Sequence, residues 1–133
     1  MPHCIVEYTD NLGDEADIPG LLRKLAARLC DSGGVFPKGG VRVRAIRLTE
    51  YVVADGAEDD AFVNLTVKIG PGRPDDFKKQ FFGGLFGIVE DHFAALFARR
   101  YLALSLYVEE ADEAGSFKKN NIHARFRAPE RKD

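Results

Sequence analysis

The amino-acid sequence predicts an α+β fold in which two β-α-β units follow each other along the chain. Alternating apolar residues mark the strands, apolar residues at helical spacing mark a helix between each pair of strands, and this order occurs twice. Parallel strands joined by a right-handed crossover place their helices against the sheet. We therefore expect one four-stranded sheet with two helices packed on one face.

Length and composition are typical of one globular domain. The chain has 133 residues, of which 45% are hydrophobic and 30% charged, so fibrous and disordered classes are excluded. We interpret residues 1–133 as a single domain, with similar halves at 2–59 and 60–126 and a frayed charged tail at 127–133. The sequence has no apolar run of membrane-spanning length and no secretory signal pattern, so a cytoplasmic location without a membrane partner is expected.

The first half begins with a strand and continues with a helix. Residues 3–8 alternate between two sides, which predicts a short strand. Asp17 can cap the following helix, with Pro19 in its first turn. The apolar stripe of this helix consists of Leu21, Leu22, Leu25 and Leu29. Gly33 and Gly34 are expected to end it.

Two strands are expected in the middle of the chain. One spans roughly residues 41–53, and its alternation changes parity near Ala45 and Ile46, which predicts a bulge. The other spans 62–69 and alternates cleanly, with Val63, Leu65, Val67 and Ile69 on one side. Since apolar Ile5 and Phe62 lie opposite the apolar rows of their strands, we expect the open face of the sheet to pack against other subunits.

The second helix is expected to be long and to begin at Pro74. Its apolar face consists of Phe77, Phe81, Leu85, Ile88, His92 and Leu96. Glycines weaken a helix interior, so close packing of another backbone is expected at Gly83, Gly84 and Gly87. Two strands follow. One has its apolar side at Leu102, Leu104, Leu106 and Val108, and a short terminal one has Ile122, Ala124 and Phe126.

The net charge and the spacing of the cysteines and histidines argue against several functions. A net charge of −2 argues against a nucleic-acid partner, which needs a concentrated positive field. The two cysteines and three histidines show no metal-ligand spacing, so buried thiols, structural histidines and no metal are expected; these residues are Cys4, Cys30, His3, His92 and His123. Lys118 and Lys119 are interpreted as solvated turn residues.

Pro2 is the most informative single residue. Removal of an initiator methionine would leave Pro2 with a free secondary amine, which is a base. The ordinary α-amino pKa is about 7.7–8.0, and burial or nearby cations lower it toward the pH at which a general base works best. Because Pro2 directly precedes a strand, its nitrogen would be held in place. Met-Pro is also a common start without any function, so the dipeptide alone leaves both interpretations open.

Arginines offer candidate sites for an anionic ligand. Arg42 and Arg44 are two apart on a strand and share a face unless a bulge intervenes, whereas Arg47 would point elsewhere. A guanidinium grips a carboxylate with two hydrogen bonds. Arg73 precedes Pro74 at a helix start, where free backbone N–H groups favour an anion. On spacing alone, each could equally be a solvated surface arginine.

Short segments spread along nearly the whole chain resemble one known family. They are Pro2-His3, Ile5-Val6-Glu7, Asp10-Asn11, Glu15-Ala16-Asp17, Pro19-Gly20-Leu21, Phe36-Pro37, Gly40-Val41-Arg42, Ala54-Asp55-Gly56, Ala61-Phe62-Val63, Lys68-Ile69-Gly70, Gly72-Arg73, His92-Phe93-Ala94-Ala95-Leu96, Leu102-Ala103-Leu104-Ser105, Phe117-Lys118 and Asn120-Asn121. On these residues the chain resembles the 5-carboxymethyl-2-hydroxymuconate isomerase family of the tautomerase superfamily, which has a MIF-like fold.

The resemblance implies a homotrimer that acts without metal or organic cofactor. It implies a small dicarboxylate or tricarboxylate dienol substrate, in the degradation of 4-hydroxyphenylacetate through homoprotocatechuate. The family's catalytic proline corresponds to Pro2, its substrate-binding arginines correspond to Arg42 and Arg73, and Arg44 also has a counterpart in the family pattern. The chain departs from the family in its glycine-rich second helix and in the charged tail beyond Phe126.

Two other functions stay open at this point. Proteins of this fold can be cytokine-like binding molecules that keep a tautomerase pocket without a metabolic substrate. A ferredoxin-like interaction module with an incidental Met-Pro start is the other alternative, and it would be favoured if Arg42 and Arg73 lay far from Pro2.

Overall fold

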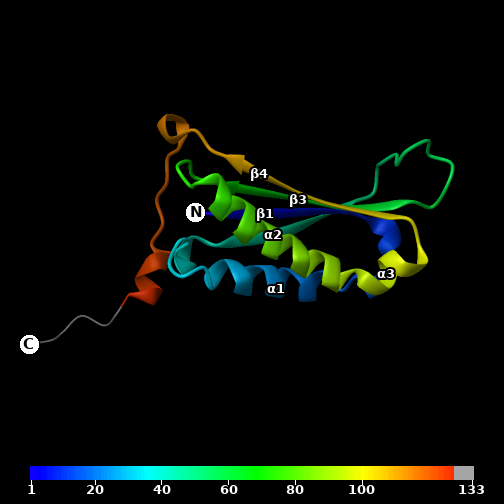
Figure 1. The fold of residues 1–133 in the computed structure, drawn as a ribbon, viewed down its shortest axis with the longest axis horizontal. Coiled ribbons are helices and arrows are strands. Elements are labelled where there is room, and N and C mark those ends of the chain that lie inside the picture. The colour runs from blue at the N-terminus through cyan, green and yellow to red at the C-terminus, as the bar shows by residue number, and fades with distance from the viewer. Residues whose placement is uncertain (128–133) are drawn as a thin grey trace, which may run out of the picture.

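The computed structural model describes residues 1–127, in which the expected sheet and helices form two layers (Figure 1). The strands and α-helices are β1 (His3–Thr9), α1 (Ile18–Cys30), β2 (Arg42–Leu48), β3 (Ala61–Ile69), α2 (Asp75–His92), α3 (Ala94–Arg99) and β4 (Leu102–Glu110). Short 3-10 helices lie between or after them: η1 (Asp10–Leu12), η2 (Asp14–Ala16), η3 (Lys38–Gly40), η4 (Glu113–Gly115) and η5 (Ile122–Phe126). Apart from Arg127, the tail expected at 127–133 lies outside the described residues.

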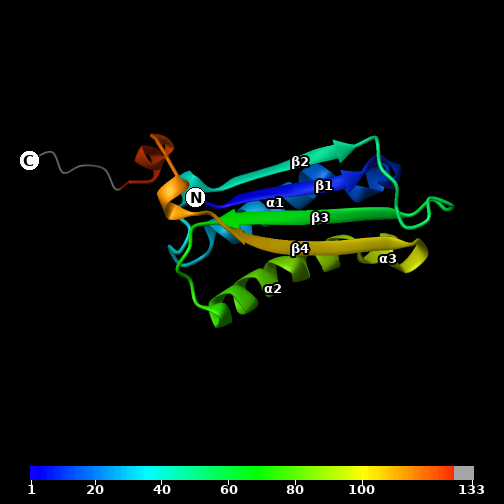
Figure 2. The same cartoon turned by 90° about the horizontal axis from the view of Figure 1, so that it is seen from above.

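The four strands form one sheet in the order β2-β1-β3-β4 (Figure 2). β1 pairs with β2 in parallel, β3 pairs with β4 in parallel, and the two β-α-β units meet through the antiparallel pair β1 and β3. At one end of this sheet His3 is opposite both Arg42 and Lys68. The tandem β-α-β arrangement confirms the predicted α+β class.

The core lies between the sheet and the α-helices α1, α2 and α3, which cover the same face (Figure 1). Fully buried members from the strands and helices are Cys4, Val6, Leu21, Leu25, Leu29, Val63, Leu65, Val67, Leu85 and Val89. Each buried Leu or Val side chain contributes about 1.5–3 kcal/mol relative to exposure. Burial also raises the pKa of the Cys4 thiol to about 12, so it stays protonated. Among residues 1–127, none of the helices combines the length and apolar character needed to cross a membrane.

The second strand is shorter than predicted and contains no bulge. β2 ends at Leu48, and its register with β1 continues unbroken from Arg42. The change of parity has another cause: Ala45 faces the helices, whereas Ile46 lies on the open face with 46% of its surface exposed. An apolar side chain on the unpartnered face of the sheet therefore imitates the pattern of a bulge.

The predicted long second helix is divided at Phe93. α2 ends at His92 and α3 begins at Ala94, while the N–H of Phe93 still bonds to the carbonyl of Val89 at 3.1 Å. Phe93 is fully buried, and the His92 ring contacts the Ala16 carbonyl oxygen at 2.7 Å. Periodicity does not reveal this break, because the apolar spacing continues across it.

The predicted terminal strand is wrong. Residues 122–126 form the 3-10 helix η5, which packs beside η3 instead of joining the sheet. Half of the surface of Phe126 and 38% of that of Ile122 remain exposed. These side chains therefore do not form the buried row that a strand would need.

The glycines of α2 do not meet a neighbouring backbone. A Cβ on Gly83 or Gly87 would have nothing within 4 Å, and one on Gly84 would be 3.7 Å from Nη2 of Arg28, which is ordinary contact. The close packing expected at these positions is therefore absent within the described chain.

Replacing Gly83 with alanine should stabilise the protein. The substitution keeps the helical backbone, lowers the entropy of the unfolded chain and introduces no clash, so we expect a gain of about 0.5–1 kcal/mol. Urea unfolding of wild type and Gly83→Ala measures this gain. A loss of stability instead would mean that a partner molecule approaches Gly83.

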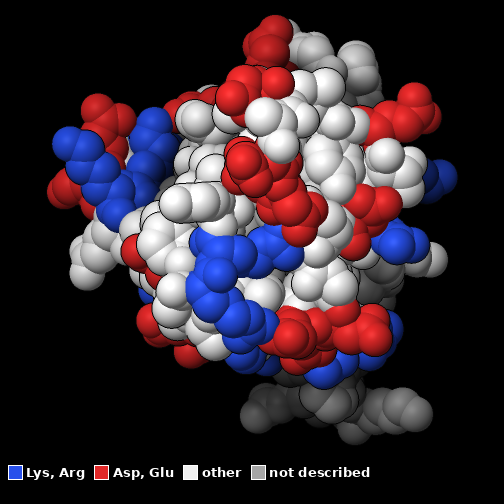
Figure 3. Space-filling view, turned by 90° about the vertical axis from the view of Figure 1, so that its right-hand side faces the viewer, with Lys and Arg blue, Asp and Glu red and all other residues white. Residues whose placement is uncertain are grey.

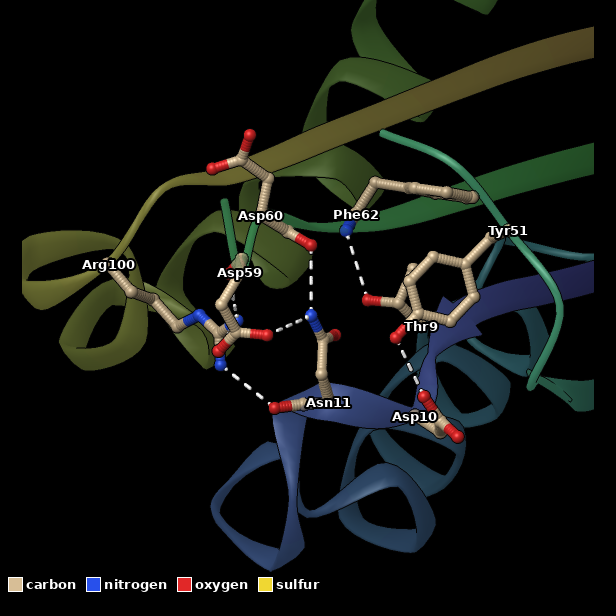
Figure 4. Close-up of polar contacts among 8 residues, drawn as sticks. All are labelled: Thr9, Asp10, Asn11, Tyr51, Asp59, Asp60, Phe62 and Arg100. Carbon is tan, nitrogen blue, oxygen red and sulfur yellow. Dashed lines mark hydrogen bonds and ion pairs between the residues drawn. The ribbon is translucent and has the colours of Figure 1, made fainter. Parts of the chain in front are cut away.

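The loop between β2 and β3 is fastened at the end of the molecule away from the N-terminus. Acidic and basic side chains are mixed over this end (Figure 3), and beneath them lies a set of hydrogen bonds (Figure 4). Asn11 donates to Asp59 at 2.9 Å, Arg100 donates to the Asn11 carbonyl at 2.9 Å, and Tyr51 donates to Asp10 at 2.7 Å. The bonds to Asp59 and from Tyr51 tie the loop to the segment after β1, and Arg100 ties the same segment to the start of β4.

Candidate active site

Pro2 lies at the end of the sheet where β1 and β2 begin and β3 ends (Figure 2). The residue is buried, and its carbonyl oxygen accepts the backbone N–H of Arg42 at 3.0 Å. His3, which follows it, is paired with strands on both sides. The nitrogen of Pro2 is therefore held by the central strand of the sheet.

A cleft of about 470 Å³ opens at this end of the molecule. Its lining comes from the chain terminus, the end of β3 and the segment after β4: Met1, His3, Lys68, Ile69, Gly70, Ala111, Gly115, Ser116, Phe117, Lys118 and Lys119. Three lysines and no carboxylate line it, so the cleft suits an anion.

Arg42 is anchored beside the chain terminus by its backbone and its side chain. Nη1 donates to the carbonyl oxygens of Gly39 at 2.9 Å and Val41 at 3.1 Å. Both bonds come from one nitrogen, so Nη2 and Nε are left as donors for a ligand within the described part of the chain. The half-buried guanidinium is thus oriented before any ligand arrives.

Arg73 connects the second half of the chain to the first. Its guanidinium donates to the Gly70 carbonyl and to the Val35 carbonyl, each at 3.2 Å. Its Cζ also lies 4.8 Å from the centre of the Phe36 ring, within the range of a cation–π interaction. These contacts fix the guanidinium at the turn between β3 and α2.

The charges of both arginines act on the amine at the chain terminus. Burial, followed by the positive charges of Lys118, Arg73 and Arg42, lowers the pKa of the N-terminal amine. Arg42 and Arg73 therefore lie close enough to influence this amine electrostatically, although neither of them lines the cleft, and their role in binding stays a prediction. Lys118 acts on the same amine and does line the cleft, although its position in an irregular polar segment carried no signal in the sequence.

Arg44 contacts His3 at the same end of the sheet. Its Nη1 is 3.0 Å from Nδ1 of His3, and since a guanidinium only donates, that ring nitrogen accepts. Burial comes first, and Arg44 second, among the causes that lower the pKa of His3. Arg44 therefore holds a neutral histidine at the cleft, and substrate binding by Arg44 stays a prediction.

The loop beside the N-terminus contains two glycines, of which Gly39 is required by its packing. A Cβ on Gly39 would lie 2.7 Å from the backbone of His123, and one on Gly40 would lie 2.8 Å from Cγ of Met1. A side chain at position 39 would push η3 away from η5, whereas one at position 40 would mainly meet the flexible side chain of Met1. Gly39 therefore allows η3 and η5 to come together.

A second hollow, of about 380 Å³, lies near the end shown in Figure 3. It is lined by Tyr8, Asp10, Gly13, Asp14, Asp17, Ile18, Pro19 and Arg47. Its three carboxylates disfavour an anionic ligand, so the terminal cleft is the better candidate. Among residues 1–127, no three His, Cys, Asp or Glu side chains group as a metal site would require.

The fold and the cationic cleft at the chain terminus define a protein of the tautomerase type. The profile of the 5-carboxymethyl-2-hydroxymuconate isomerase family matches residues 2–126. The chain belongs to this family and is an isomerase. This assignment excludes the ferredoxin-like interaction module as an alternative.

Individual relatives agree with the family assignment. The 5-carboxymethyl-2-hydroxymuconate Delta-isomerase of Escherichia coli is 44% identical over 127 residues, covering 96% of this chain and 100% of that protein. The crystal structure of a 5-carboxymethyl-2-hydroxymuconate isomerase from Deinococcus radiodurans R1 is 52% identical and superposes with a TM-score of 0.91, covering 96% and 95% of the two chains. A fused 4-OT symmetric trimer, 14% identical with a TM-score of 0.59 and covering 80% and 84%, shares the fold alone.

Proposed function

We propose that this isomerase acts on 5-carboxymethyl-2-hydroxymuconate, with Pro2 as the general base after Met1 is removed. The observation that carries the proposal is that the chain terminus lines a cleft with three lysines, where the Pro2 carbonyl binds the N–H of Arg42 and the charges of Arg42 and Arg73 act on the terminal amine. The names of the relatives supply the substrate, and the chemistry of the cleft fits its carboxylates. The reaction would serve 4-hydroxyphenylacetate degradation through homoprotocatechuate.

In the proposed mechanism one proton moves and no cofactor takes part. The neutral Pro2 nitrogen takes the proton of the 2-hydroxy group, and the electron pair of the O–H bond passes into the conjugated system as a dienolate. The protonated amine then gives that proton to a carbon further along the system. The product is the unsaturated 2-oxo acid, which has the same composition as the substrate.

The arginines supply charge stabilisation in this scheme. Arg42 and Arg73 hold the substrate carboxylates and stabilise the negative oxygen of the dienolate. Because their guanidinium groups are already fixed by backbone carbonyls, little reorganisation is needed when the charge develops. Only the first half of the chain begins with an amine, so each subunit would have one site.

We also propose a homotrimer, with the open face of the sheet buried between subunits. The α-helices α1, α2 and α3 cover the opposite face of the sheet (Figure 1), while Ile46 and Tyr107 on the open face remain 46% and 64% exposed. Exposed apolar side chains on a sheet face favour burial against a partner. Sedimentation velocity tests the trimer, and a monomer at micromolar concentration would contradict it.

Two measurements on protein from its native cells test the function. Intact mass should show that Met1 is removed, and ultraviolet absorbance should show conversion of the 2-hydroxydienoate to the 2-oxo acid. If Met1 is retained throughout, Pro2 has no free amine and the mechanism fails. Weak activity on every muconate-type acid would instead favour the cytokine-like binding protein.

The activity should depend on pH through the N-terminal amine. The neutral amine is the base, so kcat/KM should rise with pH and level off above its pKa. Lys118 is one of the cations that lower this pKa. Lys118→Gln should therefore raise the pKa and move the rising limb to higher pH. The pH profile of kcat/KM measures the shift, with Lys119→Gln as the charge-matched control; equal profiles for wild type and Lys118→Gln would contradict this role.

A further inference from the structure

The segment after β4 brings a side-chain amide to the candidate active site. From the end of β4 the chain runs past the N-terminus to η5 (Figure 1). Asn120 lies in this segment and contacts both η3 and Met1. An uncharged donor therefore stands beside the cationic groups of the cleft.

The amide of Asn120 is oriented by two strong hydrogen bonds. Its Oδ1 accepts the backbone N–H of Ile122 at 2.7 Å, and its Nδ2 donates to the Gly39 carbonyl at 2.7 Å. These partners fix which end of the amide carries the nitrogen. The second N–H faces the sulfur of Met1, with Nδ2 3.5 Å from Sδ. A thioether is only a weak acceptor, so this donor is poorly satisfied while Met1 is present.

The Gly39 carbonyl connects this amide to the arginine. The same oxygen accepts from Nη1 of Arg42 at 2.9 Å and from Nδ2 of Asn120. Both donor groups are therefore held at fixed positions relative to one backbone atom. A ligand that occupies the place of the Met1 side chain would meet the Asn120 amide, which is anchored on the same oxygen as Arg42.

We propose that Asn120 binds the substrate, donating its second N–H to the 2-oxygen. This inference rests on the proposed function, because removal of Met1 is what frees the donor. Met1 is bonded to the Pro2 nitrogen, so a ligand that fills the place of Met1 extends from the Asn120 amide toward the base. The 2-oxygen is the atom from which Pro2 takes its proton. As this oxygen becomes negative, the bond from Asn120 strengthens and lowers the barrier.

Alanine at position 120 tests the proposal by turnover. Loss of one such donor typically costs about 10²–10³-fold in kcat, so Asn120→Ala should lower kcat by roughly 10²-fold with a smaller change in KM. Asn121→Ala is the matched control, since this neighbouring asparagine is exposed, and it should behave as wild type. Unchanged kcat in Asn120→Ala would overturn the proposal.

Binding of two probes distinguishes a direct contact between Asn120 and the 2-oxygen from an indirect role in which Asn120 only supports Arg42. Calorimetry with 2-oxoadipate and adipate compares a diacid that has the 2-oxygen with one that lacks it. Asn120→Ala should bind 2-oxoadipate more weakly and adipate as wild type does. Equal weakening of both would show that Asn120 only supports Arg42, which overturns the proposal. An inactive wild type with Met1 removed would mean that the proposed function fails, whereas an active wild type with unaffected Asn120→Ala would mean that this inference alone fails.

Discussion

Replacing Pro2 with alanine should lower kcat by roughly 10²–10³-fold while the fold stays intact. A positioned general base contributes about 10²–10⁴-fold, and the variant keeps an amine but loses the ring that orients it. The backbone bond at this position survives, because it uses the carbonyl oxygen of residue 2 and the N–H of Arg42. Steady-state kinetics with the dienol acid measures the loss.

The controls for this substitution address processing and folding. Intact mass must show that Met1 is removed from both proteins, since a retained methionine would by itself block the amine. Urea unfolding should give midpoints close to each other, because the bond between the carbonyl of residue 2 and the N–H of Arg42 is kept. Turnover near the wild-type value in correctly processed Pro2→Ala would refute Pro2 as the base.

The sheet topology explains how the two halves of the chain would supply the one proposed site. β1 and β3 are antiparallel, so the start of β1 and the end of β3 lie at the same end of the sheet. The first half brings the amine of residue 2 and Arg42 to this end, and the turn after β3 brings Arg73. The start of β3 lies at the opposite end and in mid-chain, where no free amine exists.

The sequence predicted the regular elements where one face of the element is buried. β1, β3 and α1 were found because their apolar residues recur at the period of a strand or a helix. β2 is an edge strand whose open face carries the apolar Ile46. The pattern of alternation therefore predicted a strand that was too long and a bulge that is absent. The break at Phe93 left no trace because a fully buried residue continues the apolar spacing.

The site was predictable only in part, for a related reason. The chemistry proposed for Pro2 follows from its place in the chain, and the arginines stand at strand and helix starts whose positions periodicity predicts. Lys118 and Asn120 belong to an irregular segment, and only its packing beside η3 brings Lys118 to the cleft and Asn120 to Met1. Their roles depend on contacts between residues far apart in the chain, which no local pattern indicates.

Replacing Arg73 with alanine should lower kcat/KM by roughly 10²-fold, with most of the change in KM. Removing one partner of a desolvated charged hydrogen-bond pair typically costs about 2–5 kcal/mol, and the half-buried guanidinium would form such a pair with a substrate carboxylate. Arg73→Lys should recover only part of this loss. Lysine keeps the charge but lacks the planar set of donors that can reach the Gly70 and Val35 carbonyls and a carboxylate together.

The choice of pH decides whether this experiment measures binding. Arg73 also lowers the pKa of the N-terminal amine, so its removal raises that pKa and reduces the fraction of neutral base at neutral pH. Kinetic constants of wild type and Arg73→Ala should therefore be compared above the rising limb of both pH profiles, where the amine is neutral in each. Arg47→Ala serves as the control, because Arg47 lines the hollow at the other end of the sheet. A KM that is unchanged in Arg73→Ala under these conditions would show that Arg73 acts only on the amine and does not hold a carboxylate.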